Sequence, residues 1–269
     1  MNTTAVASHS IKDTFIEVIK YRPLVLALTE RHLATRYRGS FLGFLWSILN
    51  PLCLMLVYVL VFHYYMRTPS EVNYPVFLFC GLLPWIWTSS ALVEGTLSVV
   101  SSGHLITKSM FPPQILPVVS VVTTLINFLL SLPLLIIFMV AIGHPLTWAL
   151  FFLPVLIALH FLFLVGLSIG LSALNVFFRD VQHVLQNFLT FLFFLCPIVY
   201  PETVVPDRFR FSLDLNPFAL FTQCYHSIVL QGSLLTPSQL VYLCACTGVT
   251  LLAGNALFVR YREGFAEML

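Results

Sequence analysis

Long runs without charged residues dominate the pattern of polar and apolar positions along this chain. No Asp, Glu, Lys or Arg occurs in the ranges 39–66, 72–93, 109–178, 181–201 and 215–259. A helix needs about 20 mostly apolar residues to cross a bilayer, and a central Arg or Asp costs about 2.5–3.5 kcal/mol on the insertion scale. The pattern therefore predicts an all-α integral membrane protein.

Proline, glycine and asparagine divide these runs into six predicted transmembrane helices. The predicted spans cover residues 41–63, 75–98, 115–142, 146–174, 183–200 and 238–259. Residues 216–231 are apolar on one side but carry Thr222, Gln223 and His226 on the other. A segment of ~16 residues is short for a span, so it is expected to form an interfacial or re-entrant helix.

The positions of the basic residues predict the orientation in the membrane. Six spans place ten of them on the side that carries both termini, and Arg67, Arg208 and Arg210 on the other. Basic residues favour the cytoplasmic side, so both termini are predicted to be cytoplasmic. A seventh span over residues 216–231 would weaken the asymmetry to eight against five.

Residues 1–40 are expected to form a cytoplasmic amphipathic region ahead of a transmembrane domain over residues 41–269. Ser10 is a candidate helix cap, and Pro23 suits the first turn of a second, basic helix. The apolar face of this second helix is expected to include Leu26, Leu33 and Tyr37. Such a region would lie along the membrane surface near anionic headgroups, although an ordinary basic flank also explains the arginines.

Composition excludes several classes of function. The chain is 59% hydrophobic and only 9% charged, against about 25% charged residues in globular proteins, and its net charge of +2 gives no reason to expect nucleic acid. The segment from Gly103 to Ser109 lacks the glycine pattern of a phosphate-binding loop, and the histidines lack metal-ligand spacing. We therefore expect no catalytic site, bound metal or cofactor.

Glu94 is the only acidic residue that lies well inside a predicted span. It is either a functional candidate within the membrane or a residue near the water line.

Two aromatic stripes remain open to two interpretations. Tyr58 and Phe62 lie one turn apart on the first span, and Phe188, Phe191 and Phe194 recur every three residues on the fifth. They could line a pore along which sugar rings slide, but the residues alone favour packing or contact with lipid.

One long motif and several shorter ones occur in a distinctive order. The first runs from Arg36 to Pro51 (RYRGSFLGFLWSILNP). The later motifs are GLLPW at 81–85, LITKSMFP at 105–112, RDVQ at 179–182, CPIVYP at 196–201 and LNP at 215–217. Together they resemble the membrane subunit of ABC-type polysaccharide exporters, the type-2 permease family of O-antigen, capsule and teichoic acid export.

The resemblance implies a homodimer in the bacterial inner membrane that works with two copies of a separate ABC ATPase. ATP and Mg would bind that partner rather than this chain. The substrate implied is a polyprenyl-diphosphate-linked polysaccharide, with O-antigen favoured over capsule or teichoic acid. The resemblance also implies short re-entrant gate helices on the outer side, before the last span.

The resemblance further assigns expected roles to individual residues. Arg36 and Arg38 would meet the lipid diphosphate at the entrance, and Pro201, Asn216 and Pro217 would belong to the outer gate. The expected channel aromatics are Tyr58, Phe62, Phe191 and Phe194. The expected contacts with the ATPase are Lys108, Phe111, Arg179 and Asp180.

Three other functions remain open. A type-2 permease for a drug or small lipid would share the architecture. An intramembrane glycosyltransferase would share the hydropathy, but it needs clustered acids, and Asp207 and Asp214 are isolated. An ion-coupled transporter would need more buried ionisable groups than Glu94.

Overall fold

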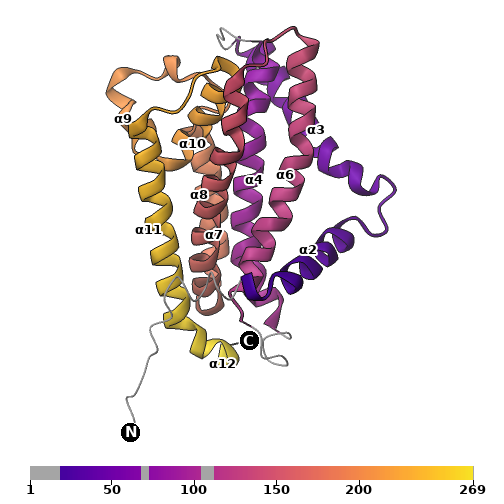
Figure 1. Cartoon of the computed structure of the whole chain (residues 1–269), viewed down its shortest axis with the longest axis vertical. Coiled ribbons are helices and arrows are strands. Elements are labelled where there is room, and N and C mark those ends of the chain that lie inside the picture. The colour runs from indigo at the N-terminus through magenta and orange to yellow at the C-terminus, as the bar shows by residue number, and fades with distance from the viewer. Residues whose placement is uncertain (1–18, 68–72, 104–111, 269) are drawn as a thin grey trace.

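A computed structural model describes residues 19–67, 73–103 and 112–268, and within these ranges the regular structure is entirely helical (Figure 1). Five helical stretches are long and apolar enough to cross a membrane: Gly43–Tyr65, Tyr74–Ser101, Ile115–Ala141, Trp148–Phe177 and Pro237–Gly264. They fall at five of the six predicted spans.

The long helices are joined by short ones, several of them single 3-10 or π turns. The α-helices are α2 (Arg22–Tyr37), α3 (Trp46–Tyr58), α4 (Tyr74–Ser101), α6 (Ile115–Ala141), α7 (Leu153–Phe177), α8 (Asp180–Leu195), α9 (Phe211–Asp214), α10 (Pro217–His226), α11 (Pro237–Tyr261) and α12 (Phe265–Met268). The 3-10 segments are Gly43–Leu45, Trp148–Phe152, Glu202–Val204, Asp207–Phe209 and Arg262–Gly264, and the π-helical segments are Val59–Tyr65 and Ser227–Gln231.

Helix α4 is the centre of the bundle. Its most apolar stretch is 78% buried, whereas the corresponding stretches of the other four long helices are only 22–33% buried. It packs against α6, α7 and α10, with Leu78, Phe79 and Trp87 almost fully enclosed.

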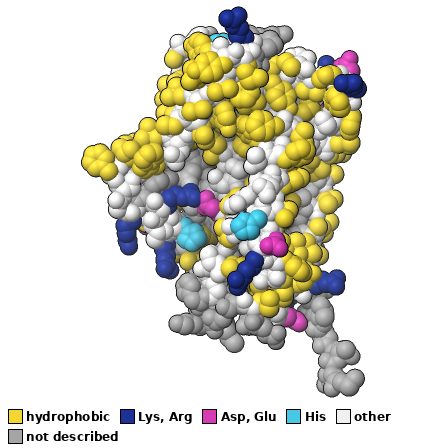
Figure 2. Space-filling view, turned by 180° about the vertical axis from the view of Figure 1, so that it is seen from behind, with side chains coloured by type: hydrophobic (Ala, Val, Ile, Leu, Met, Phe, Trp, Pro, Cys, Tyr) yellow, Lys and Arg dark blue, Asp and Glu magenta, His cyan; other side chains and the backbone are white. Residues whose placement is uncertain are grey.

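The outer helices leave apolar side chains exposed. Hydrophobic side chains cover a broad band of the face in Figure 2, and most charged side chains on this face lie below the band. This distribution suits a bundle surrounded by lipid.

Helix α2 packs on the start of α6 by a different face from the one predicted. Val25 and Thr29 are buried, and Val25 contacts Ile115 and Val119. Leu26, expected on the apolar face, is 65% exposed, so the predicted face was wrong at this position. The side chain of Tyr37 and the predicted helix around Ser10 lie outside the described structure.

The fifth predicted span differs from the helix observed there. Helix α8 ends at Leu195 rather than continuing to residue 200, because Cys196 precedes Pro197 and takes an extended conformation. At 16 residues, α8 is about 24 Å long, shorter than the about 30 Å of a hydrocarbon core.

Residues 217–231 form α10 and a π-helical turn inside the bundle. The side predicted to be polar is enclosed as well, since Thr222 is 4% and His226 7% exposed. This helix is therefore a core element and not a helix lying on the bundle surface.

Helices α7 and α11 approach each other at glycines. A Cβ added at Gly254 would overlap the carbonyl oxygen of Gly166, and one added at Gly166 would lie 2.6 Å from the Leu251 nitrogen. Small residues at such positions let two membrane helices pack backbone to backbone.

We expect Gly254→Ala to destabilise the protein by about 1–3 kcal/mol, because the new methyl group forces α7 and α11 apart. The same change at Gly248, also on α11, is the matched control, since a Cβ there meets nothing within 4 Å. Thermal unfolding in detergent measures both variants. Equal unfolding temperatures would show that the close glycine contact is unimportant.

Candidate functional site

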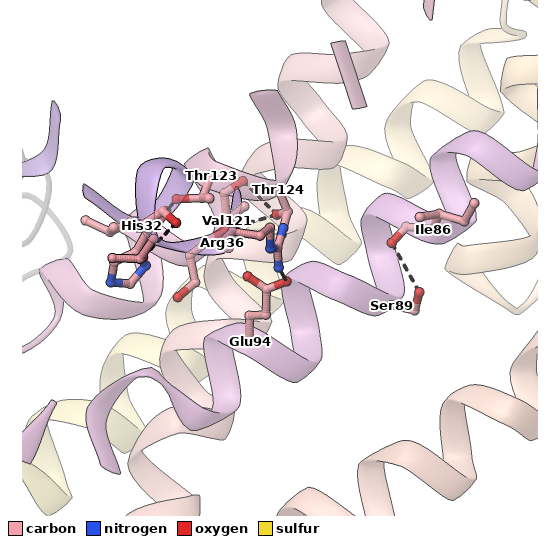
Figure 3. A network of polar contacts seen from close by, with 11 residues as sticks. His32, Arg36, Ile86, Ser89, Glu94, Val121, Thr123 and Thr124 are labelled. Atoms are coloured by element: carbon pink, nitrogen blue, oxygen red, sulfur yellow. Dashed lines mark hydrogen bonds and ion pairs between the residues drawn. The ribbon is translucent and has the colours of Figure 1, made fainter. Parts of the chain in front are cut away.

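An ion pair joins the end of α2 to the central helix. Arg36 lies in the last turn of α2, and its guanidinium donates to the carboxylate of Glu94 on α4. Figure 3 shows Arg36 reaching across to Glu94 beside Thr123 and Thr124 of α6. The two side chains are 37% and 31% exposed, so they lie at the edge of the bundle and not in its core. The single acid noted inside a predicted span therefore has a specific partner.

Arg36 also lines a cavity of about 520 Å³ between α3, α4, α6 and the segment before α3. The cavity is rich in hydroxyl, amide and indole groups. Its lining consists of Arg36, Ser40, Trp46, Ser47, Asn50, Pro51, Leu83, Ile86, Trp87, Ser90, Thr124, Asn127, Phe128 and Ser131. Arg36 is the one charged residue in this lining among the residues that the structure describes, so the cavity combines a positive charge with neutral polar groups along its walls.

Two basic residues near Arg36, His32 and Arg38, differ from it in charge or position. Burial lowers the pKa of His32, and the nearby Glu94 carboxylate opposes this shift only in part. His32 is therefore neutral near pH 7, which leaves Arg36 as the cation facing Glu94. Arg38, paired with Arg36 in the sequence prediction, is exposed at the end of α2 and does not line the cavity.

The predicted channel aromatics fall into two groups. The Tyr58 ring stacks on Phe193 of α8 at 5.4 Å between centroids and lies 6.1 Å from Phe62, so this pair takes part in packing between helices. Phe191 and Phe194 are 60% and 55% exposed on the outward face of α8.

Polar side chains share the outward side of α8 with these phenylalanines. His183, Gln186, Asn187 and Thr190 are all exposed, with a spacing that repeats along one side of a helix. Polar groups facing hydrocarbon are costly, so this side is suited to water or to another subunit. This spacing of polar residues can be seen in the sequence alone.

A buried histidine cluster, also missed from the sequence, holds α10 in the bundle. His160 of α7 lies 3.0 Å from the Thr88 hydroxyl and 3.4 Å from the Tyr225 hydroxyl, and its ring stacks on Phe221 at 4.2 Å. His226 of α10 lies 3.2 Å from the carbonyl oxygen of Phe77 on α4. Two histidines therefore connect α10 to both of its larger neighbours.

The predicted outer-gate residues lie in the segment between α8 and α10. The Asn216 side chain caps α10 by accepting from the Phe218 backbone N–H at 3.1 Å, and Pro217 occupies the first turn. Pro201 directly precedes a 3-10 turn. Their observed roles are to shape turns and begin a helix.

The predicted ATPase contacts are only partly described. Lys108 and Phe111 lie outside the described residues. Arg179 and Asp180 are exposed at the junction of α7 and α8, at the end of the bundle where Phe177 contacts Phe265 of α12 (Figure 1). That end is opposite to α9.

These features define a polytopic membrane protein whose bundle carries a polar cavity and one outward polar face. The chain belongs to the ABC-2 type transporter family, whose pattern matches residues 23–230. This finding confirms the predicted resemblance to type-2 ABC permeases.

The similar proteins found by comparison are named as polysaccharide exporters. The chain is 42% identical to the O-antigen export system permease protein RfbA of Myxococcus xanthus over 94% of this chain and 98% of that protein. It is 30% identical to RfbA of Klebsiella pneumoniae over 91% and 95%. It is 30% identical to the polysialic acid transport protein KpsM of Escherichia coli over 89% and 93%.

We expect His160→Phe to loosen α10, because the ring contacts persist while the Tyr225 hydroxyl loses its partner inside the bundle. Leaving such a group unpaired costs about 1–3 kcal/mol. Hydrogen exchange should become faster at residues 217–231, and the unfolding temperature should fall. His183→Phe, on the exposed side of α8, is the control. Unchanged exchange in His160→Phe would contradict the anchoring role.

Proposed function

We propose that this chain is the membrane permease subunit of an ATP-driven exporter of lipid-linked polysaccharide, with O-antigen as the favoured substrate. The observation that carries the proposal is the 42% identity to an O-antigen export permease across nearly the full length of both proteins. The polar cavity and the polar outward side of α8 support it, because both suit a hydrated, hydroxyl-rich substrate. Capsule and teichoic acid are the alternatives.

The proposed arrangement has six crossings in a bacterial inner membrane. The five long helices account for five of them, and α8 with residues 196–200 forms the sixth, shorter one. Both termini then lie in the cytoplasm, as the basic residues predict. Residues 1–40 form the interface region, and residues 41–269 form the transmembrane domain.

Two copies of the chain are proposed to form a channel between them. The exposed side of α8 supports this arrangement, because its polar residues would be poorly placed against lipid but well placed along a water-filled path. Phe191 and Phe194 would then face the glycan, with Tyr58 and Phe62 packed behind or beside them.

Two copies of an ABC ATPase are proposed to supply the energy, with ATP and Mg bound there. Lys108 and Phe111 would contact the ATPase on one loop, and Arg179 and Asp180 would form a second contact. The residues of the outer segment (Pro201, Asn216 and Pro217) would move with the outer gate. Closure of the ATPases would be transmitted through these contacts as rigid-body motion.

Arg36 and Arg38 are proposed to receive the diphosphate of the polyprenyl carrier. The support is that Arg36 lies in the last turn of α2 and lines the cavity, and that Arg38 follows directly after the end of this helix.

In a strain that lacks this chain, we expect polysaccharide to accumulate inside the cell, and the wild-type chain should restore it to the surface. The double variant Arg36→Gln/Arg38→Gln should restore about tenfold less, as expected from the loss of ~1.4 kcal/mol of charge-assisted binding. Immunoblots of surface glycan and of membrane-inserted protein measure export and assembly separately.

Arg208→Gln/Arg210→Gln, in the segment between α8 and α10, is the matched control for this pair and should export normally. Full export by the Arg36→Gln/Arg38→Gln variant would exclude the entrance role. Normal surface glycan in the deletion strain would exclude the polysaccharide function itself.

The double variant Asn187→Leu/Thr190→Leu should lower export severalfold without lowering stability, because it makes the proposed channel wall apolar. Cys244→Leu/Ala245→Leu, at exposed positions of α11, is the control and should change neither. Export assays and thermal unfolding separate the two effects. If the α8 variant exports normally, its outward side does not line the path.

A further inference from the structure

We infer that the cavity between α3, α4 and α6 binds the glycosyl diphosphate head of the carrier lipid, with a sugar in the cavity and a phosphate on Arg36 in place of Glu94. This inference rests on the proposed function and deepens it. It assigns Glu94 as a resident counter-ion that the substrate displaces.

The charges around the cavity favour an exchange of partners. Arg36 belongs to the cavity lining, whereas Glu94 does not. Their ion pair is partly exposed, and pairs of this kind contribute little to stability. A guanidinium binds phosphate oxygens through two parallel hydrogen bonds, so a diphosphate is a strong competitor for it.

The neutral lining fits a sugar. Among the residues that the structure describes, the Asn50 amide and the Ser90 hydroxyl have no intramolecular hydrogen bond. Trp87 also lines the cavity, but its side chain is 1% exposed and its ring stacks on Phe128 at 4.9 Å, so it forms a wall of the cavity. The Asn50 amide and the Ser90 hydroxyl suit a sugar, because sugar hydroxyls both donate and accept. A lipid tail in the same space would leave both groups unpaired.

The size and direction of the cavity suit this ligand. Its volume of about 520 Å³ lies within the ~300–1,000 Å³ typical of small-molecule sites. On α4, Leu83, Trp87 and Ser90 share one side of the helix, and Glu94 follows on that side one turn beyond Ser90. The phosphate would thus bind at the Glu94 end, and the sugar would extend toward Leu83.

The test uses the full chain in nanodiscs of zwitterionic phosphatidylcholine, with dissociation constants measured by microscale thermophoresis. The probes are a polyprenyl diphosphate carrying one hexosamine, the same lipid without sugar, and inorganic diphosphate. We expect the sugar-bearing lipid to bind most tightly. If inorganic diphosphate binds as tightly as that lipid, or the sugar adds nothing, the cavity is not a glycosyl site.

Glu94→Gln should bind both lipids about fivefold more tightly, because the competing carboxylate is gone. Arg36→Gln should bind both at least about tenfold more weakly. Asn50→Ala/Ser90→Ala should weaken only the sugar-bearing probe, by about fivefold. Asp207→Asn removes the acid of the exposed Arg210–Asp207 pair and is the control, with no change expected.

The charge-swapped variant Arg36→Glu/Glu94→Arg separates binding from structure. It should recover the thermal stability of the ion pair but not the affinity for diphosphate lipids. Wild-type affinity in this variant, or unchanged or weaker binding in Glu94→Gln, would show that the pair is only a structural contact.

Failure of this inference differs from failure of the proposed function. If the chain restores surface polysaccharide but the cavity variants bind all probes as wild type does, the inference is wrong and the export function stands. If the variants shift affinity as expected while deletion leaves surface polysaccharide unchanged, the lipid-head site stands and the polysaccharide function fails.

Discussion

In a bilayer, polar groups must find partners within the protein, and this constraint shapes the whole bundle. The central helix α4 meets it with hydroxyls that donate to carbonyls one turn back, as Thr88 does to Pro84 at 2.8 Å and Thr96 to Leu92 at 2.7 Å. Some side chains find their partner on another helix instead. His160 and His226 do so between α4, α7 and α10, and their contacts hold a helix too short to span the membrane inside the core.

Polar groups that have no partner within the described protein therefore point to contacts with something else. The outward side of α8 presents Gln186, Asn187 and Thr190, although the exposed sides of the long helices are largely apolar. The cavity beside Arg36 is lined by an amide and a hydroxyl, of Asn50 and Ser90, without partners among the described residues. Neither feature is explained by stability in lipid. Both are explained if a hydrated ligand completes the missing hydrogen bonds, which is the requirement of a glycan transporter.

The sequence pattern predicted those features that depend only on residues close together in the chain. Uncharged runs located the five long helices, and Pro23 marked the start of α2, because apolar length and proline geometry act over neighbouring residues. The Arg36–Glu94 pair could not be predicted this way, since its members are far apart in the sequence and meet only after α2 packs on α6. The burial of the polar side of α10 was missed for the same reason: partners on α4 and α7 override its mixed composition.

The cavity adjoins, in the sequence, the residues proposed to contact an ATPase. Its walls include α4 and α6, the two helices on either side of residues 104–111, which contain Lys108 and Phe111. Helix α2 is attached to both walls, through Val25 on the start of α6 and through Arg36 on Glu94 of α4. A relative shift of α4 and α6 would therefore change the shape of the cavity and strain the ion pair together. A ligand that binds both the cavity and Arg36 would be sensitive to such a shift, and under the proposed function an ATPase would supply it.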